Sequence, residues 1–314
     1  MAKKKRVVIA LGGNALQKNG EVTAEAQKSV AKKVGEIIAK LSSKYEIVVA
    51  HGNGPQVGNI LIHEEQASTE KAPAMPLETA VAMSEGQIGY WLAQSIANAF
   101  MAQGKNKKVA SIVTQVEVDK NDPAFRKPTK PIGQFYTESE ALKIAKEKGW
   151  IMKEDAGRGW RRVVPSPKPK DIVEKREIID LVNSGAIVIA AGGGGIPVYR
   201  TKILRTLKGV DAVIDKDFAA AKLAELTKAD AFISVTAVPN AYINFGTEDE
   251  VALGHITRKE AECYAAAGHF KSGSMLPKIQ AATSFVKKGK VGIITSIDNL
   301  ELSLEGKAGT IISL

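Results

Sequence analysis

Residues 7–16, which read VVIALGGNAL, decide the fold. An apolar run typical of a buried strand leads directly into the glycine pair Gly12-Gly13, and a helix can begin just beyond it. Such a turn gathers backbone N–H groups around a point that favours negative charge. We interpret this stretch as a strand–turn–helix unit that binds an anion.

Two other segments repeat this arrangement. Residues 46–50 lead into HGNGPQVG at 51–58, and residues 186–190 lead into the glycine run 192–195. Because glycine also simply ends strands, any one of these turns alone could be ordinary turn chemistry. Three in one chain favour a protein that holds several anionic groups together.

The composition is that of a globular protein. The 314 residues are 44% hydrophobic and 25% charged, enough for one large α/β domain or two lobes. No apolar run approaches the roughly 20 residues that cross a bilayer, and the N-terminus carries no secretory signal pattern. Cys263 is the only cysteine, which excludes an internal disulfide and argues against a cysteine metal site. We expect a cytoplasmic protein that does not enter a membrane.

The net charge of +10 is concentrated in two places. Residues 3–6 are all basic, and we expect them to form a solvated terminus. Residues 118–176 hold 15 Lys and Arg against 9 Asp and Glu. Such a segment steers small anions or binds nucleic acid, but the aromatic content of 5% is low for a single-strand binder. We expect no nucleic-acid partner.

Apolar strand patterns alternate with helical ones along most of the chain. Continuous apolar strands separated by helices predict an α/β fold with a mostly parallel sheet covered on both faces. The expected strands are 6–11, 46–50, 108–113, 186–190, 209–214, 231–236, 290–295 and 309–313. The expected helices are 23–43, one from about 55, 77–104, 171–184, 218–226, 257–267 and 275–287. Between 117 and 169, prolines and charges interrupt the alternation, which indicates an inserted excursion or lid.

Several enzyme classes are excluded by missing motifs. The chain has no P-loop, no Gly-x-Gly-x-x-Gly after the first strand, no protein-kinase motif set and no Gly-x-Ser-x-Gly elbow. Its four histidines do not pair at zinc-ligand spacing. We therefore expect neither a dinucleotide enzyme nor a serine hydrolase.

Three lysines occupy unusual places. Lys216 lies between Asp215 and Asp217 at a strand end, where α/β proteins form ligand sites. Lys278 is predicted in the first turn of a helix, where the helix dipole disfavours a cation unless an anion binds there. Lys130 is held between two prolines. Each could instead be a solvated surface lysine, and the two aspartates could merely cap a helix. Three anion-binding turns, these lysines and no evident nucleophile together favour phosphoryl transfer.

These residues resemble the carbamate kinases of the amino-acid kinase superfamily. The similarity covers the glycine turns and the segments 121–125, 128–131, 153–167, 212–217 and 268–278, in family order. The resemblance implies a three-layer α/β/α sandwich with a small protruding subdomain at about 117–169. It also implies an acceptor lobe at 1–208, a nucleotide lobe at 209–314, and a homodimer.

The implied reaction is ATP plus carbamate giving ADP plus carbamoyl phosphate, with Mg²⁺ bound to the nucleotide. In the family it commonly ends arginine breakdown by the deiminase route, in the direction that makes ATP. No side chain of the chain is expected to be a dedicated metal ligand.

The resemblance assigns roles to individual positions. Lys216 and Lys278 would neutralise phosphate charge, Asp217 would orient them, and Lys130 would hold carbamoyl phosphate. The transferring phosphoryl group would bind at Gly12, Gly13 and Asn14, and the carbamate side at Gly52 and Asn53. The nucleotide would contact Asp215, Lys216, Tyr242, Phe245, Met275 and Lys278. Asn14 and Asn53 could instead be turn residues only.

The chain departs from the superfamily pattern at two positions. Ala10 stands where other branches carry a lysine, which fits the carbamate branch, and Lys130 is expected to supply the missing charge. Pro239 replaces an expected charged residue near the adenine, so we expect an effect on nucleotide affinity or base preference. Two other functions stay open: a sister kinase for another carboxylate such as acetylglutamate, and a non-catalytic sensor or nucleic-acid binder.

Overall fold

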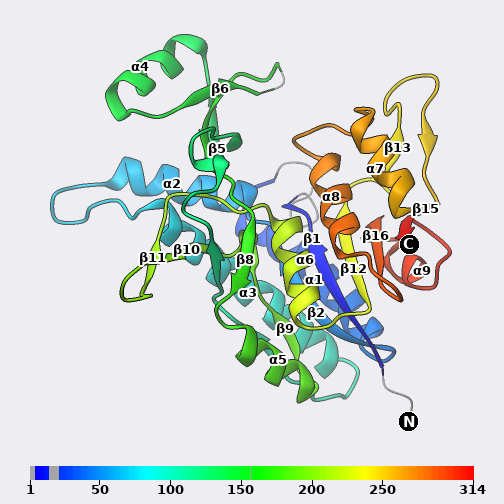
Figure 1. Ribbon diagram of the computed structural model, residues 1–314. Helices are drawn as coiled ribbons and strands as arrows, with labels where there is room; N and C mark the ends of the chain where they lie inside the picture. The colour runs from blue at the N-terminus through cyan, green and yellow to red at the C-terminus, as the bar shows by residue number, and fades with distance from the viewer. Residues whose placement is uncertain (1–3, 14–20, 156) are drawn as a thin grey trace.

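The computed structural model describes residues 4–13, 21–155 and 157–314 (Figure 1). Its largest sheet has eight strands in the order β15-β17-β16-β12-β1-β2-β9-β3. All neighbouring strands in it are parallel except β16 and β17. Their bounds, in the order of the sheet, are His255–Thr257, Thr310–Ser313, Val291–Ser296, Ala231–Thr236, Lys5–Leu11, Tyr45–His51, Ile187–Ile189 and Val109–Ser111.

Successive side chains of the central strand β1 alternate between two hydrophobic cores, one on each face of the sheet. Val7, Ile9 and Leu11 point to one face and pack in a cluster with residues of α1 (Ala24–Leu41) and α3 (Leu77–Met101). Val8 and Ala10 point to the other face and pack with residues of α5 (Lys175–Asn183), α6 (Lys216–Leu226) and α8 (Met275–Phe285). Because successive side chains of a strand alternate, one buried strand supplies both clusters. The predicted three-layer α/β/α fold with a mostly parallel sheet is confirmed.

The remaining helices are shorter or lie nearer the edges. They are α2 (Gly54–Ala67), α4 (Glu138–Lys148), α7 (Arg258–Ala266) and α9 (Leu300–Leu304). Capping boxes begin two of them, with Thr137 and Glu140 at α4 and Thr257 and Glu260 at α7. No helix in the described part of the chain combines the length and the apolarity that a membrane crossing needs.

Of two smaller sheets, one lies within the stretch 117–169 that the sequence marked as an excursion, and the other joins the two ends of that stretch to residues 196–209. Strands β5 (Lys130–Tyr136), β7 (Trp160–Val164) and β6 (Met152–Glu154) form one antiparallel sheet, which projects from the body together with α4 (Figure 1). The other has the order β11-β10-β4-β8, with bounds Leu207–Gly209, Ile196–Arg200, Gln115–Val118 and Pro169–Ile172. A two-stranded ribbon pairs β13 (Tyr242–Ile243) with β14 (Val251–Ala252).

Two element predictions were wrong. The apolar stretch 209–214 is not a strand: β11 ends at Gly209, and residues 210–214 lead to α6 without a ladder partner. Its apolar character reflects burial of Val213 and Ile214 rather than sheet pairing. The helix expected at 171–184 begins only at Lys175, because Asp171 and Ile172 pair with β4.

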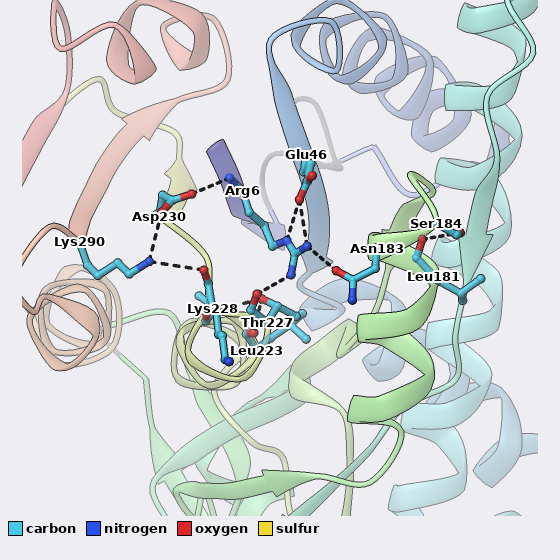
Figure 2. Close-up of polar contacts among 11 residues, drawn as sticks. Arg6, Glu46, Leu181, Asn183, Ser184, Leu223, Thr227, Lys228, Asp230 and Lys290 are labelled. Atoms are coloured by element: carbon cyan, nitrogen blue, oxygen red, sulfur yellow. Dashed lines mark hydrogen bonds and ion pairs between the residues drawn. The ribbon is translucent and has the colours of Figure 1, made fainter. Parts of the chain in front are cut away.

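The amino end of the sheet is tied together by Arg6 (Figure 2). Its guanidinium lies 2.9–3.0 Å from a Glu46 carboxylate oxygen and donates to the Thr227 carbonyl (2.6 Å) and the Asn183 side chain (2.8 Å). Its backbone N–H donates to Asp230 (2.8 Å). These contacts connect β1 to β2, to the ends of α5 and α6, and to the start of β12. The expectation that residues 3–6 form a solvated terminus is therefore wrong for Arg6, whose side chain is 11% exposed.

Candidate active site

Two glycine turns meet at the carboxyl ends of β1 and β2. The Gly12 N–H donates to the Val235 carbonyl (3.1 Å), and the Gly52 N–H donates to the Leu11 carbonyl (2.8 Å). A Cβ on Gly52 would lie 3.0 Å from the Gly13 nitrogen and 3.2 Å from Cδ of Lys216. Only glycine lets the two turns and the lysine stem approach this closely. Asn14 lies outside the described residues.

The third glycine turn closes the same edge of the sheet. Gly193 has a φ of +64°, and a Cβ there would lie 2.1 Å from Nδ2 of Asn53. The Asn53 side chain is 4% exposed and donates to the Ser84 hydroxyl (2.8 Å). Asn53 is thus held between α3 and the third turn.

Asp217 brings two lysines from different helices to one point. Its Oδ1 accepts from Lys216 (2.7 Å) and from the Ser234 hydroxyl (2.6 Å), and its Oδ2 accepts from Lys278 (3.0 Å). Lys278 lies in the first turn of α8, as the sequence predicted, whereas Lys216 begins α6 two residues before the helix expected at 218–226. Both ammonium groups therefore lie beside the N-terminal ends of helices, where an anion is favoured.

Burial and the neighbouring opposite charges have opposing effects on the pKa values of this cluster. Burial alone would raise the pKa of Asp217, but Lys216, Lys278 and the Ser234 hydroxyl hold it well below its usual range. Burial lowers the pKa of Lys216, and the neighbouring Lys278 lowers it further, while Asp217 raises it. An anionic ligand would relieve the repulsion between the two ammonium groups, so the cluster is suited to a phosphate.

Lys130 reaches the same place from the projecting sheet. Its ammonium lies 2.8 Å from Oδ2 of Asp215, while Oδ1 of Asp215 caps α6 by accepting from the Asp217 N–H (2.9 Å). Burial would raise the pKa of Asp215, and Lys130 outweighs that effect and lowers it. One aspartate thus joins the projecting sheet to the helix that carries Lys216.

These side chains line a single open cleft of about 750 Å³. The predicted residues that line it are Gly12, Gly13, Gly52, Asn53, Lys130, Asp215, Lys216, Asp217 and Lys278. An adjoining pocket of about 290 Å³ is lined by the predicted nucleotide residues Tyr242, Phe245 and Met275, and it shares Lys278 with the cleft. The Tyr242 and Phe245 rings lie 5.7 Å apart, centroid to centroid. Pro239 does not line this pocket, although its neighbour Val238 does.

Sequence reasoning missed several of the residues that complete the site. Ser234 is fully buried. It is the polar residue in the interior of the strand AFISVT, and a polar residue within an apolar strand could have marked it as a site residue. His269 and Lys271 line the adjoining pocket. Arg158 and Arg161 line the cleft from the projecting sheet, with their guanidinium carbons 5.0 and 4.9 Å from the Phe135 ring centroid. Their motif had been recognised, but its place beside Lys130 depends on the fold.

Within the described residues, no group of three His, Cys, Asp or Glu side chains converges as metal ligands would. The carboxylate oxygens of Asp215 and Asp217 are engaged by lysines, a hydroxyl and a backbone N–H. Mg²⁺ commonly keeps several waters and binds through substrate phosphates rather than through a protein cage. The donor set therefore fits a metal that arrives with a nucleotide.

His51 makes folding stability depend on pH. The side chain is buried at the end of β2, and burial lowers its pKa to about 4, whereas its contact with the Gly52 carbonyl (3.0 Å) raises it. Between pH of about 6.5 and 4 the unfolded chain binds more protons, so stability falls as the pH falls, by up to about 3 kcal/mol. Urea unfolding from pH 7.5 to 4.5 should show a shallower loss in His51→Gln. Equal slopes would contradict this assignment.

Comparison with known proteins shows the family to which the chain belongs. The sequence pattern of the amino acid kinase family matches residues 5–296. A carbamate kinase of Thermococcus kodakarensis is 52% identical over 313 residues, 98% of each chain. The chain belongs to the carbamate kinases of the amino acid kinase family. This confirms the family and the enzyme class that the motifs predicted.

Two solved structures are similar to the chain to different degrees. The carbamate kinase from Giardia lamblia bound to AMP-PNP is 42% identical and covers all of both chains, with a TM-score of 0.91. N-acetylglutamate synthase from Neisseria gonorrhoeae is 14% identical, covers 98% of this chain and 61% of its own, and has a TM-score of 0.59. The second likeness shows a shared fold alone. The roles given above to individual side chains stay predictions.

Proposed function

We propose that the chain catalyses reversible phosphoryl transfer between ATP and carbamate, giving ADP and carbamoyl phosphate. The observation that carries this is the convergence of Lys216 and Lys278 on Asp217, beside the glycine turns at Gly12 and Gly52. Phosphoryl transfer passes through a loose transition state with spread negative charge, so positioned positive charge and N–H groups supply most of the catalysis. No side-chain nucleophile is needed.

The adjoining pocket suits the nucleotide. Tyr242, Phe245 and Met275 offer flat apolar surface for a base, and Lys278 stands where this pocket meets the cleft. A solved relative binds the ATP analogue AMP-PNP, which supports a nucleotide here. Bound to the nucleotide phosphates, Mg²⁺ would supply further charge neutralisation. In this assignment residues 209–314 form the nucleotide lobe and residues 1–208 the acceptor lobe.

The carbamate would bind in the cleft, away from the adjoining nucleotide pocket. Three residues of the cleft would bind it: Gly52 through its backbone, Asn53 through the side-chain amide that Ser84 holds in place, and Lys130 from the projecting sheet. Asp215 holds the Lys130 ammonium within the cleft. An arriving carbamoyl phosphate offers Lys130 a second anion, so its ammonium would bind the transferring group or the carbamate oxygen.

Replacing Lys130 by alanine is expected to raise the KM for carbamoyl phosphate by about tenfold to a hundredfold, the usual value of one hydrogen bond to a charged group. The KM for ADP should change little, since Lys130 does not line the adjoining pocket. Initial rates of ATP formation measure both constants. Lys127→Ala removes an exposed lysine from the same segment and serves as the control. Unchanged kinetics in Lys130→Ala would refute this role.

We further propose the physiological setting. Carbamoyl phosphate is a mixed anhydride, so its phosphoryl group transfers to ADP favourably, and the ATP-forming direction suits the end of arginine breakdown by the deiminase route. The family resemblance and the single cysteine support a cytoplasmic location. Strains lacking the gene should lose arginine-dependent ATP formation if this setting is right.

We propose that two copies associate through α3. Met83, Tyr90 and Met101 are 43%, 54% and 63% exposed and lie on one face of that helix, because they are spaced 7 and 11 residues apart. Such a stripe of large apolar side chains is typical of an interface. Tyr90→Asp is expected to sediment as a monomer at micromolar concentrations where the unaltered protein is a dimer. A monomeric unaltered protein, or a dimeric Tyr90→Asp, would contradict the proposal.

An acceptor screen tests the reaction itself. ATP consumption is measured with carbamate, formed from ammonia and bicarbonate, and with acetylglutamate and acetate at equal concentration. We expect turnover with carbamate to exceed turnover with acetylglutamate and with acetate by at least about a hundredfold, as the relationship to the carbamate kinases predicts. Faster turnover with acetylglutamate would favour the sister-kinase alternative. No turnover with any acceptor, but nucleotide binding, would favour a sensor.

A further inference from the structure

A separate cavity, of about 490 Å³, lies on the outer side of α6. Figure 1 shows α6 between β8 and α8, and the cavity is lined by residues from both sides. Its apolar floor includes Phe218, Ala221 and Phe285, of which Phe285 is 6% exposed. None of its lining residues lines the catalytic cleft or the adjoining nucleotide pocket. The volume lies in the range of small-molecule sites.

The rim of this cavity is strongly basic. Its charged residues are Lys168, Lys222, Lys228, Lys287, Lys290 and a single carboxylate, Glu225. Glu225 accepts from Lys222 (2.8 Å) and Lys287 (3.2 Å), and Lys290 pairs with Asp230 (3.2 Å). Three of the five lysines therefore already have carboxylate partners.

The other two lysines are available to a ligand. Within the described residues, neither Lys168 nor Lys228 lies within ion-pair distance of a carboxylate. The Lys168 ammonium lies 5.8 Å from the centroid of the Phe218 ring, so one free cation stands over an aromatic part of the floor. Lys228 follows α6 with a φ of +55°, a left-handed conformation that favours glycine. Lysine therefore occupies a backbone position that glycine adopts more easily.

We infer that this cavity binds an amphipathic organic anion. The apolar body of such a ligand would lie on Phe218 and Phe285, and its carboxylate, sulfonate or phosphate would meet one of the two free lysines, either Lys168 beside the Phe218 ring or Lys228 just beyond the end of α6. A neutral apolar compound would leave the two cations without partners, and a small inorganic anion would leave the floor uncovered. The combination of floor and rim thus selects a molecule with one charged end.

Binding of 8-anilinonaphthalene-1-sulfonate tests this inference, with the neutral N-phenyl-1-naphthylamine as a comparison probe. The full-length protein is saturated with AMP-PNP and Mg²⁺, so that the nucleotide pocket does not compete, and probe fluorescence is titrated. We expect one sulfonate probe per chain, and about tenfold weaker binding in the double variant Lys168→Gln, Lys228→Gly. The neutral probe should bind more weakly and be little affected by the substitutions.

The variants are chosen to preserve folding. Lys228→Gly relieves the left-handed backbone while removing the charge, and Lys168 is exposed. Lys288→Gln removes an exposed lysine beside Lys287 that does not line the cavity, and it should bind the sulfonate probe like the unaltered protein. Equal binding by the double variant, equal binding of the two probes, or no binding of the sulfonate probe would each overturn the inference.

Discussion

Replacing Lys216 or Lys278 by alanine is expected to lower kcat for phosphoryl transfer by about a hundredfold to a thousandfold, the usual cost of one preorganised group that stabilises transition-state charge. Each ammonium is fixed on Asp217, at 2.7 and 3.0 Å, and each projects from the first turn of its helix into the cleft. The KM for nucleotide should change less than kcat, because charge spreads over the phosphoryl oxygens mainly in the transition state.

The double variant should lose less than the product of the single effects, since both lysines act through one carboxylate and are not independent. Steady-state rates of ATP formation measure all three variants, and urea unfolding shows whether each is folded. Lys259→Ala, at an exposed position of α7, is the matched control and should keep the unaltered kcat. A kcat within threefold of the unaltered value in either single variant would remove that lysine from the mechanism.

Replacing Arg6 by methionine is expected to lower the free energy of unfolding by about 2–4 kcal/mol. Methionine keeps most of the side-chain volume but leaves the Glu46 carboxylate and the Thr227 carbonyl without their donor (Figure 2). The network lies at the amino end of the sheet, opposite the cleft. We therefore expect kcat to be unchanged at temperatures where the variant is folded.

Urea unfolding with a common m-value measures this change. The matched control is Arg258→Met, because Arg258 pairs with Glu262 at 2.8 Å on the exposed side of α7, with side chains 42% and 52% exposed. Such a surface pair contributes at most about 1 kcal/mol. If Arg6→Met and Arg258→Met lower the free energy of unfolding equally, the Arg6 contacts contribute no more to stability than a surface ion pair does.

The sequence predicted the central layers because their signal is local. Strands such as β1 are continuous apolar runs buried on both faces, and their glycine turns follow directly in the chain. Lys216 was recognised because it lies between two aspartates at an expected strand end, and Lys278 because a lysine in the first turn of a helix needs an explanation that nearby residues do not offer.

What the sequence did not predict depends on contacts between distant segments. The four-stranded sheet pairs residues 115–118 with 169–172 and 196–198, and no local pattern encodes that pairing. The run 209–214 has the composition of a strand but no ladder partner. Arg6 belongs by sequence to a basic terminus. It becomes buried and hydrogen-bonded only because the fold brings Glu46 and Thr227 next to it. Ser234 gains its role only when Asp217 lies beside it.

The most direct test of the central claim is ATP formation from ADP, carbamoyl phosphate and Mg²⁺ by the purified protein. We predict rapid ATP production that requires carbamoyl phosphate and that acetyl phosphate at the same concentration does not replace. Folded protein that makes no ATP from carbamoyl phosphate, or that uses acetyl phosphate equally well, would contradict the account.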